Sequence, residues 1–345
     1  MKFLNIKDSL ISITGRYESS SNGAWRFSFP GISIKLRFKN TNISARLCDF
    51  GNDGMNNHFN VLIDGNIHSV IKLSNEIKDI ELYKKADDNW HTLDLFKRTE
   101  SNVGECEVYG FLVDEGAIIE KAIEPELLIE FIGDSITCGY GVEAKSATDN
   151  FEDYTENAWL SYASVAAREL NARHIMVSYS GKGVYRNWGS EPFTGTTLSE
   201  IYSRSLADRN DSHWNFKNVM PSIVVVNLGS NDFSPPLFAN EQMFKEAYLN
   251  LIKTIRNNYG ESCFIFCVTG PVLVKTLGDT HTNYIESIIE NRKEKDDSRI
   301  FSFTLTRQTS RIGFGAQWHP NIEQSKKNGI EIAEFIKKIF TSVYV

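Results

Sequence analysis

The sequence predicts two domains: an antiparallel β-sandwich over residues 1–122, then an α/β domain with a parallel sheet over residues 123–345. Three observations lead to this fold class. The 345 residues exceed the about 100–200 residues of a typical single domain. Up to residue 120, short runs alternate between apolar and polar residues with period two, as half-buried strands do. After Glu124 and Pro125, strand-like runs alternate with helical stretches, which indicates crossover connections and a parallel sheet.

In the first domain, strands are expected at residues 31–38, 59–63, 89–96 and 107–113. The second of these strands is reinforced by a turn signal: the run 59–63 is followed by Asp64 and Gly65, a pair that favours a tight hairpin because both central turn positions need positive φ. Short strands separated by turn signals indicate a sandwich of antiparallel sheets.

In the second domain, five strand-like runs are expected, at residues 127–132, 174–179, 223–228, 263–268 and 300–305. Before the fourth run, apolar residues recur with helical spacing and form one continuous stripe: Phe244, Ala247, Tyr248, Leu251, Ile252 and Ile255. A similar stripe predicts a helix over residues 159–170. The boundary between the domains is placed within residues 114–126.

Composition and charge exclude several classes of protein. Hydrophobic residues make up 41% and charged residues 23%, which is enough apolar material for a core. The net charge of −7 argues against nucleic acid as a partner, since such proteins present a basic face. No apolar run approaches the roughly 20 residues that span a bilayer, so no membrane partner is expected.

The ends and the cysteines give two further expectations. The first residues lack the apolar segment and cleavage site of a signal peptide, which predicts a cytoplasmic protein, or a secreted one if a leader has been removed. The five cysteines include no CxxC pair, so neither a disulfide framework nor a cysteine-type zinc site is expected. Cys263 and Cys267 lie in an apolar run and are interpreted as buried, inert thiols.

Residues able to do chemistry follow the predicted parallel strands. In such a sheet, ligands bind beyond the carboxyl ends of the strands. The first strand is followed by Ser135, the second by Gly181, the third by Asn231, and the last by His319. We therefore expect a serine, a glycine-rich loop, an asparagine and a histidine to meet at one edge of the sheet.

These residue types complement one another in ester hydrolysis. A serine hydroxyl becomes a good nucleophile when a base takes its proton, and histidine is the usual base. Attack on a carbonyl places negative charge on oxygen, which the backbone N–H groups of Ser135 and Gly181 and the side-chain amide of Asn231 could stabilise. The G-x-S-x-G nucleophile elbow is absent, because residue 137 is threonine.

The four blocks resemble those of the SGNH (GDSL) hydrolase superfamily. They are residues 131–137 with Gly-Asp-Ser at their centre, then Gly181, then residues 229–232, then His319 with Pro320. The resemblance extends upstream: a strand-rich domain with the runs 61–65 and 91–100 in front of residues 129–141 is similar to carbohydrate esterase family 2. It implies a jelly-roll followed by a three-layer, flavodoxin-like hydrolase domain, and serine-based removal of O-acetyl groups from plant polysaccharides without a metal or organic cofactor.

One position departs from the superfamily pattern. Most members carry Asp three residues before the catalytic histidine and some two before, whereas this chain has Ala316 and Gln317 there. The resemblance allows a Ser–His dyad in which a backbone carbonyl holds the imidazole. We expect that carbonyl to come from residues 315–317, because no carboxylate occurs between Gly313 and Ile322. The competing arrangement is a triad completed by a distant acid, Asp232 or Asp279.

Other residues receive weaker interpretations. Asp134 and Asp232 are expected to be structural hydrogen-bond acceptors, and residues 211–213 a solvated loop. His281 and His213 are placed in loops and are minor alternatives to His319 as the base. Exposed aromatic faces stack on sugar rings, so Trp318 and Trp188 are candidates for binding substrate, with ordinary packing as the alternative.

The function expected from these residues is an esterase that deacetylates carbohydrate, with Ser135 as nucleophile and His319 as base. Two other classes stay open: an SGNH lipase or thioesterase acting on short acyl esters, and a non-catalytic glycan-binding protein. Residues 185–189 are polar and aromatic, unlike a long acyl groove, and both Ser135 and His319 are present. The glycan, the hydroxyl attacked and the oligomeric state are not indicated by the sequence.

Overall fold

The computed structural model describes the backbone of residues 1–344 and the side chains of residues 1–340. Its contacts divide the chain into two compact units. Unit 1 comprises Met1–Glu124 together with Ser205–Ser212, and unit 2 comprises Pro125–Arg204 and His213–Val345. Among the described residues, no helix combines the length and apolar character needed to cross a bilayer.

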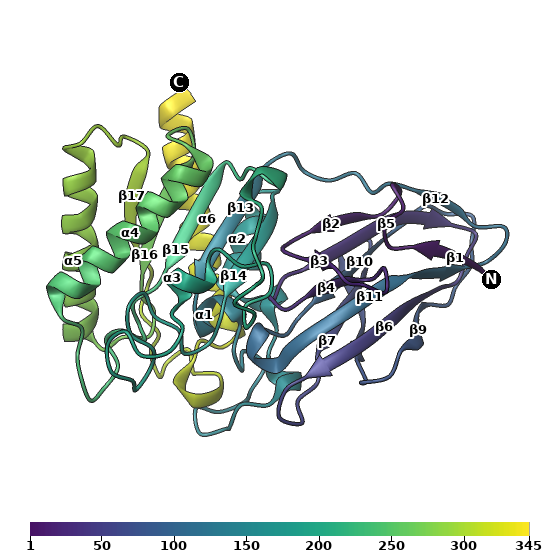
Figure 1. Ribbon diagram of the computed structural model, residues 1–345, viewed down its shortest axis with the longest axis horizontal. Helices are drawn as coiled ribbons and strands as arrows, with labels where there is room; N and C mark the ends of the chain where they lie inside the picture. The colour runs from purple at the N-terminus through teal and green to yellow at the C-terminus, as the bar shows by residue number, and fades with distance from the viewer. Residues whose placement is uncertain (345) are drawn as a thin grey trace. The chain divides into compact units, whose positions relative to one another are not determined.

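Unit 1 consists of two six-stranded antiparallel sheets, as the period-two alternation predicts (Figure 1). The first sheet has the order β3 (Glu18–Ser19), β4 (Trp25–Phe27), β11 (Gly104–Val113), β6 (Ile43–Gly51), β9 (Lys78–Tyr83), with β1 (Lys2–Asn5) paired to β11. The second has the order β12 (Ile118–Glu120), β5 (Ser33–Lys39), β10 (His91–Lys97), β7 (His58–Ile63), β8 (Asn66–Lys72), with β2 (Ser12–Thr14) paired to β5.

Side-chain alternation builds the core of unit 1. Ile34, Leu36 and Phe38 of β5 are buried, while the residues between them are partly exposed. The β7–β8 hairpin turns at Asp64 and Gly65, whose φ angles of +52° and +80° are those that the sequence predicts for the turn. One short 3₁₀ turn, η1 (Ser101–Val103), precedes β11.

Unit 2 is a parallel five-stranded sheet flanked by helices, which confirms the predicted fold class. The strand order is β14 (Arg173–Ser178), β13 (Leu128–Gly133), β15 (Ile223–Asn227), β16 (Phe264–Thr269), β17 (Ile300–Thr304). Helix α2 (Tyr162–Glu169) packs on α6 (Ile322–Tyr344), and α4 (Glu241–Tyr259) packs on α5 (Lys275–Lys293). Figure 1 shows these two helix pairs on opposite faces of the sheet. Shorter elements complete the unit: α1 (Ser135–Cys138), α3 (Leu198–Ile201), η2 (Asp153–Thr155), η3 (Ala158–Leu160), η4 (Phe216–Asn218) and η5 (Ala316–Trp318).

The predicted helix over residues 159–170 is divided into two elements. The side chain of Asn157 accepts a hydrogen bond from the N–H of Trp159 and starts the 3₁₀ turn η3. Ser161 then adopts an extended conformation, so α2 begins only at Tyr162. The apolar stripe is correct, but the extended backbone at Ser161, whose side chain makes no capping hydrogen bond, sets where α2 begins.

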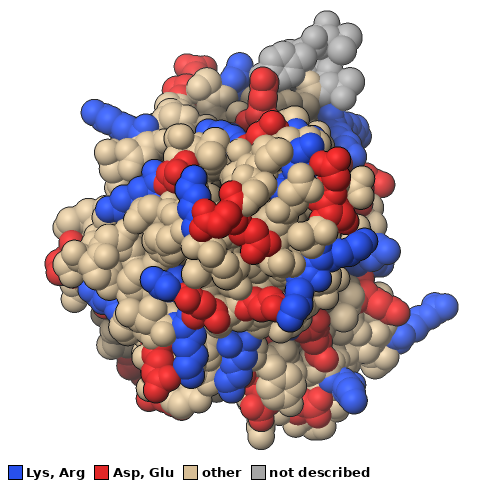
Figure 2. Space-filling view, turned by 90° about the vertical axis from the view of Figure 1, so that its right-hand side faces the viewer, with Lys and Arg blue, Asp and Glu red and all other residues tan. Residues whose placement is uncertain are grey.

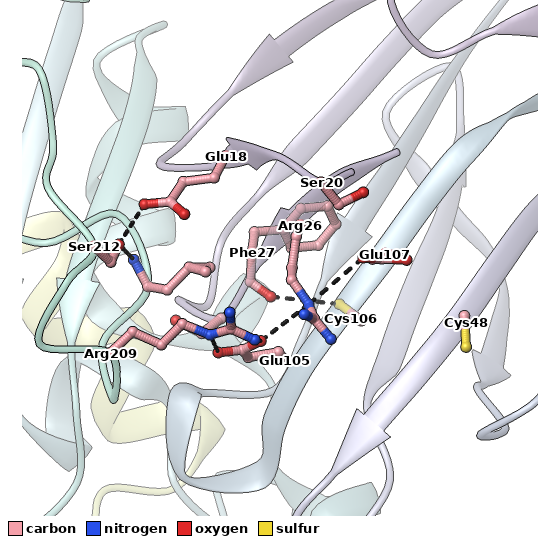
Figure 3. A network of polar contacts seen from close by, with 12 residues as sticks. Glu18, Ser20, Arg26, Phe27, Cys48, Glu105, Cys106, Glu107, Arg209 and Ser212 are labelled. Carbon is pink, nitrogen blue, oxygen red and sulfur yellow. Dashed lines mark hydrogen bonds and ion pairs between the residues drawn. The ribbon is translucent and has the colours of Figure 1, made fainter. Parts of the chain in front are cut away.

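The segment Ser205–Ser212 belongs by its contacts to unit 1, although it lies within the range 123–345 that the sequence assigns to the second domain. Figure 3 shows how it is held: Arg209 makes two 2.7 Å hydrogen bonds to the carboxylate of Glu105, and the hydroxyl of Ser212 donates to Glu18. Ser212 is buried, so the solvated loop expected at residues 211–213 is wrong at this position.

The charged side chains are mixed in sign. On the face drawn in Figure 2, Lys and Arg are interspersed with Asp and Glu, and no extended patch of either sign covers it.

Candidate active site

Ser135 is the first residue of α1, directly after β13 and at the carboxyl end of the central part of the sheet. Asp134 precedes it in an extended conformation, and its side chain accepts a 3.0 Å hydrogen bond from the N–H of Ile136, which caps the short helix. Ser135 is 7% exposed. The Asp134 interaction agrees with the structural role that the sequence suggested.

His319 lies against Ser135 across 184 residues of sequence. Its Nε2 is 2.8 Å from the Ser135 Oγ, and its Nδ1 is 3.1 Å from the carbonyl oxygen of Ala316. A carbonyl can only accept, so Nδ1 carries the hydrogen and Nε2 is left to accept from the serine hydroxyl. The imidazole is therefore held by a carbonyl within residues 315–317, as expected.

The two carboxylates considered as distant acids are engaged elsewhere. Asp232 accepts hydrogen bonds from the backbone N–H groups of residues 184–186, in the loop that follows β14. Asp279 pairs with Lys275 and Arg307. Among the side chains of residues 1–340, no ion pair to His319 is found. The geometry is therefore that of a dyad.

The turn before His319 has a strained backbone. Gln317 and Trp318 have φ angles of +48° and +64°, in the left-handed region that costs non-glycine residues about 1–2 kcal/mol each. Main-chain hydrogen bonds hold this conformation: Gly315 N–H donates to the His319 carbonyl at 2.8 Å, and Ala316 N–H donates to the Gly141 carbonyl at 3.1 Å. The second bond ties the histidine turn to the loop that follows α1.

Burial sets the protonation state of His319. Removal of the ring from water disfavours its charged form and lowers its pKa to about 4, although the backbone carbonyls of Ala316 and Gln317 oppose this shift. The ring is consequently neutral at neutral pH. A neutral imidazole with Nε2 unprotonated is the form that can take a proton from Ser135.

Two backbone donors face no acceptor of the protein. Neither the N–H of Ser135 nor that of Gly181 has a hydrogen-bond partner within the part of the chain that the structure describes. Gly181 has a φ of +76°, and a Cβ built on it would meet nothing within 4 Å, so the space beside it is open. Both features are those required of donors to an oxyanion.

Asn231 differs from the simple expectation for an oxyanion donor. Its Nδ2 is 2.9 Å from the Lys182 carbonyl and 3.3 Å from Asp134 Oδ2, so both amide hydrogens already face acceptors. The first bond fixes the orientation of the amide, and the second is long enough to be exchanged for a substrate oxygen. Burial raises the pKa of Asp134 to about 6, against the lowering effect of the Ser230 hydroxyl and the Ile136 N–H.

The two tryptophans predicted to bind substrate are exposed. Trp318 is 60% exposed and Trp188 is 69% exposed, although Trp188 is attached to the glycine loop by its N–H, which donates to the Gly181 carbonyl at 2.8 Å. Trp318 contacts Phe314 edge to face. Because more than half of each side chain is exposed, Trp188 and Trp318 can offer an aromatic surface to a ligand.

The sequence reasoning placed His281 wrongly and overlooked Tyr140. His281 lies in α5 rather than in a loop, is 2% exposed, and packs against Phe233 and Gly229. Tyr140 lies against His319, with ring centroids 4.3 Å apart, and no motif assigned it a role. Its position directly before Gly141, whose carbonyl binds the histidine turn, is the signal that could have found it.

Comparison with known proteins agrees with this architecture. The family model for GDSL-like lipases and acylhydrolases matches residues 129–332, and the model for the N-terminal region of carbohydrate esterase 2 matches residues 13–122. A solved family two carbohydrate esterase from Clostridium thermocellum, in complex with cellohexaose, is 33% identical with a TM-score of 0.89, covering 96% of this chain and 99% of that one.

Two curated proteins are also similar. The cellulase/esterase CelE of Acetivibrio thermocellus is 33% identical over 90% of this chain, which spans 37% of that protein's length. An acetylxylan esterase / glucomannan deacetylase of Cellvibrio japonicus is 22% identical over 96% of this chain and 89% of its own. The fold and the matched motifs thus define the class of GDSL-type ester hydrolases. Within that class, the chain belongs to the family 2 carbohydrate esterases.

Proposed function

We propose that this chain is a serine esterase that removes O-acetyl groups from carbohydrate through an acyl-enzyme on Ser135. The observation that carries the proposal is the contact of His319 Nε2 with Ser135 Oγ at 2.8 Å, with Nδ1 bonded to the Ala316 carbonyl. The names of the similar proteins, an acetylxylan esterase / glucomannan deacetylase among them, support acetylated polysaccharide as the substrate class.

The chemistry follows from the two residues. Ser135 Oγ attacks the acetyl carbonyl while His319 Nε2 takes the hydroxyl proton. The tetrahedral oxyanion accepts hydrogen bonds from the N–H groups of Ser135 and Gly181 and from the amide of Asn231. On its collapse His319 returns the proton to the sugar oxygen, which leaves as a free hydroxyl.

Water completes the cycle. His319 takes a proton from water as it attacks the acetyl-serine carbonyl, and the second tetrahedral intermediate releases acetate while the proton returns to Ser135 Oγ. Trp318 and Trp188 offer exposed aromatic faces to a sugar ring beside this centre.

The test is hydrolysis of 4-nitrophenyl acetate, butyrate and octanoate, together with acetate release from acetylated xylan and acetylated glucomannan. We expect the acetate ester to be the best of the three and acetate to be released from at least one polysaccharide. The Ser135→Ala variant should lose at least about a thousandfold in kcat/KM with unchanged circular dichroism. Preference for octanoate would favour a lipase, and glycan binding without hydrolysis a binding protein.

A further inference from the structure

Tyr140 contacts both His319 and a second aromatic residue, Phe151. Its ring centroid lies 4.3 Å from that of His319, with 36° between the ring planes. The ring of Phe151 also stacks on Tyr140, with centroids 4.4 Å apart and 26° between the planes. The Tyr140 hydroxyl donates to Oε1 of Gln317, two residues before the histidine. The ring is thus fixed in its plane by a stack on one face and by a hydrogen bond at its tip.

His319 has little else to stabilise a positive charge. When it takes the proton from Ser135 it becomes an imidazolium, a form that burial disfavours. In a triad, an aspartate at Nδ1 offsets this cost. Here Nδ1 is bonded to the neutral carbonyl of Ala316, and among the side chains of residues 1–340 no charged group forms an ion pair with the ring.

The face of an aromatic ring can supply part of what the carboxylate would. The quadrupole of a phenol ring places negative potential over its face, and a cation within about 6 Å of the centroid is attracted more strongly where water is excluded. The His319 ring lies within that distance of the Tyr140 ring. A neutral imidazole gains much less from this field than an imidazolium.

We propose that Tyr140 is a positioning residue that takes over part of the role of the missing triad acid, its ring face stabilising the imidazolium of His319 in the transition state. The inference rests on the proposed function of Ser135 and His319. The bond from the Tyr140 hydroxyl to Gln317 holds the ring against the imidazole, and it uses the position two residues before the histidine, where some members of the superfamily carry the acid.

The structure connects this ring to the histidine turn by more than one route. Gln317 holds a left-handed conformation, and its N–H donates to the Asp149 carbonyl at 3.3 Å, near Phe151 in the chain. The Asp149 carboxylate is bonded to the N–H groups of Lys145 and Ser146. Ala316, which holds Nδ1, is bonded to Gly141, the neighbour of Tyr140. Ring, turn and imidazole are therefore fixed as one assembly.

The test separates the ring from the hydroxyl. Tyr140→Leu removes the aromatic face and retains apolar volume, whereas Tyr140→Phe retains the face and removes the hydroxyl. With 4-nitrophenyl acetate at pH 7, we expect Tyr140→Leu to lower kcat/KM about 3- to 30-fold, through kcat and with KM within about twofold. Tyr140→Phe should keep kcat/KM within about threefold. The control Tyr154→Leu makes the same change at an exposed tyrosine of η2 and should not alter the kinetics.

A second readout follows the charge on the histidine. Loss of the ring face removes stabilisation of the cation, so the pKa of His319, measured from its ring resonances in the Ser135→Ala background, should fall by about 0.5–1 unit in Tyr140→Leu and stay within about 0.3 unit in Tyr140→Phe. Entry of water in place of the ring would move this pKa upward instead. A rise or no change in Tyr140→Leu, or equal kinetic losses in Leu and Phe variants, would overturn the inference.

Failure of the proposed function would look different. If Ser135→Ala and His319→Ala retain esterase activity, the dyad itself is wrongly assigned and the Tyr140 variants have no bearing on catalysis. If both lose activity while Tyr140→Leu retains wild-type kcat and pKa, the dyad stands and the role of Tyr140 is refuted. Circular dichroism of each variant controls for folding.

Discussion

His319 illustrates how one residue's surroundings fix its chemistry. Its Nδ1 hydrogen is directed to the Ala316 carbonyl, its Nε2 accepts from Ser135, and burial keeps the ring neutral. The residue types and their order along the chain predict this pair, because serine and histidine at strand ends have few other uses in combination. The source of the carbonyl follows from reach, since an imidazole held by its own turn needs an acceptor on that turn.

The lowered pKa of His319 predicts the acid limit of activity. Burial places the folded-state pKa at about 4, below the ordinary value of 6.5, so the base stays unprotonated until the pH falls to about 4. We expect kcat/KM for 4-nitrophenyl acetate to change little from pH 7 to pH 5.5 and to fall below about pH 4.5. Circular dichroism at each pH separates titration from unfolding. Half-loss of activity near pH 6.5 would show a solvated imidazole and contradict the burial argument.

Asn231 carries the second prediction at this scale. Its amide is oriented by the Lys182 carbonyl and can exchange its long contact with Asp134 for a substrate oxyanion. Asn231→Ala should therefore lower kcat by about 10²–10³ and leave KM within about threefold. Asn258→Ala, which removes an amide bonded to its own helix in α4, is the matched control. A change confined to KM would assign Asn231 to substrate binding. The sequence could not foresee the competing acceptors, because one of them is a backbone carbonyl of another loop.

The elements were predictable where one periodicity governed them. The alternation in β5 and the helical stripe in α4 each occupy a face that the core requires, so pattern and structure agree. Before α2, Asn157 and Ser161 are the N-cap residues of η3 and α2. The apolar pattern there predicted the buried face of the helix correctly, but it did not predict the residue at which α2 begins. His281 was misplaced for a related reason: it occurs inside α5, whose polar residues weaken the helical signal.

Gly141, in the loop that follows α1, contacts Ala316 of η5, and this contact can be tested by substitution. Gly141 has a φ of +52°, and a Cβ built there would lie 2.4 Å from the Cβ of Ala316, the residue that holds His319. Gly141→Ala should displace η5 and lower kcat by at least about tenfold, because a 1 Å misplacement of a catalytic group can cost about a hundredfold. It should also reduce the free energy of unfolding by about 1–3 kcal/mol.

Gly65→Ala is the control for Gly141→Ala, because it introduces the same backbone strain without a steric clash. Gly65 has a φ of +80° and nothing within 4 Å of a built Cβ, so alanine there suffers only the left-handed backbone cost of about 1 kcal/mol. We expect it to lower stability modestly and to leave kcat unchanged. Equal activity losses in the two variants would mean that the η5 contact does not position His319. Urea unfolding and ester hydrolysis on the same samples provide both measurements.

At the scale of the whole molecule, the chain order and the compact units do not coincide. Residues 205–212 follow α3 of unit 2 and yet pack within unit 1, where the Ala207 N–H donates to Ser28 Oγ at 3.0 Å and Arg209 pairs with Glu105 (Figure 3). Eight residues with no hydrophobic period carry no pattern that would reveal their partners. Arg26 also contacts Glu105, so the carboxylate that receives Arg209 lies between two arginines.

Ser212 is the residue through which the integrity of this segment can be tested. Its buried hydroxyl donates to Glu18 and accepts from the N–H groups of Ser205 at 3.2 Å and Leu206 at 2.8 Å, which uses its one donor and both acceptor positions. Ser212→Ala leaves two N–H groups and a carboxylate without that partner, and should lower the free energy of unfolding of unit 1 by about 1–3 kcal/mol.

The readout is hydrogen exchange, resolved by strand. Faster exchange should appear in β3 and β4, near Glu18 and Arg26, while kcat stays within about twofold because Ser135 and His319 both belong to unit 2. Ser203→Ala removes an exposed hydroxyl bonded only to the Glu200 carbonyl of its own turn, and serves as the control. If Ser212→Ala leaves hydrogen exchange in β3 and β4 unchanged, residues 205–212 do not stabilise these strands.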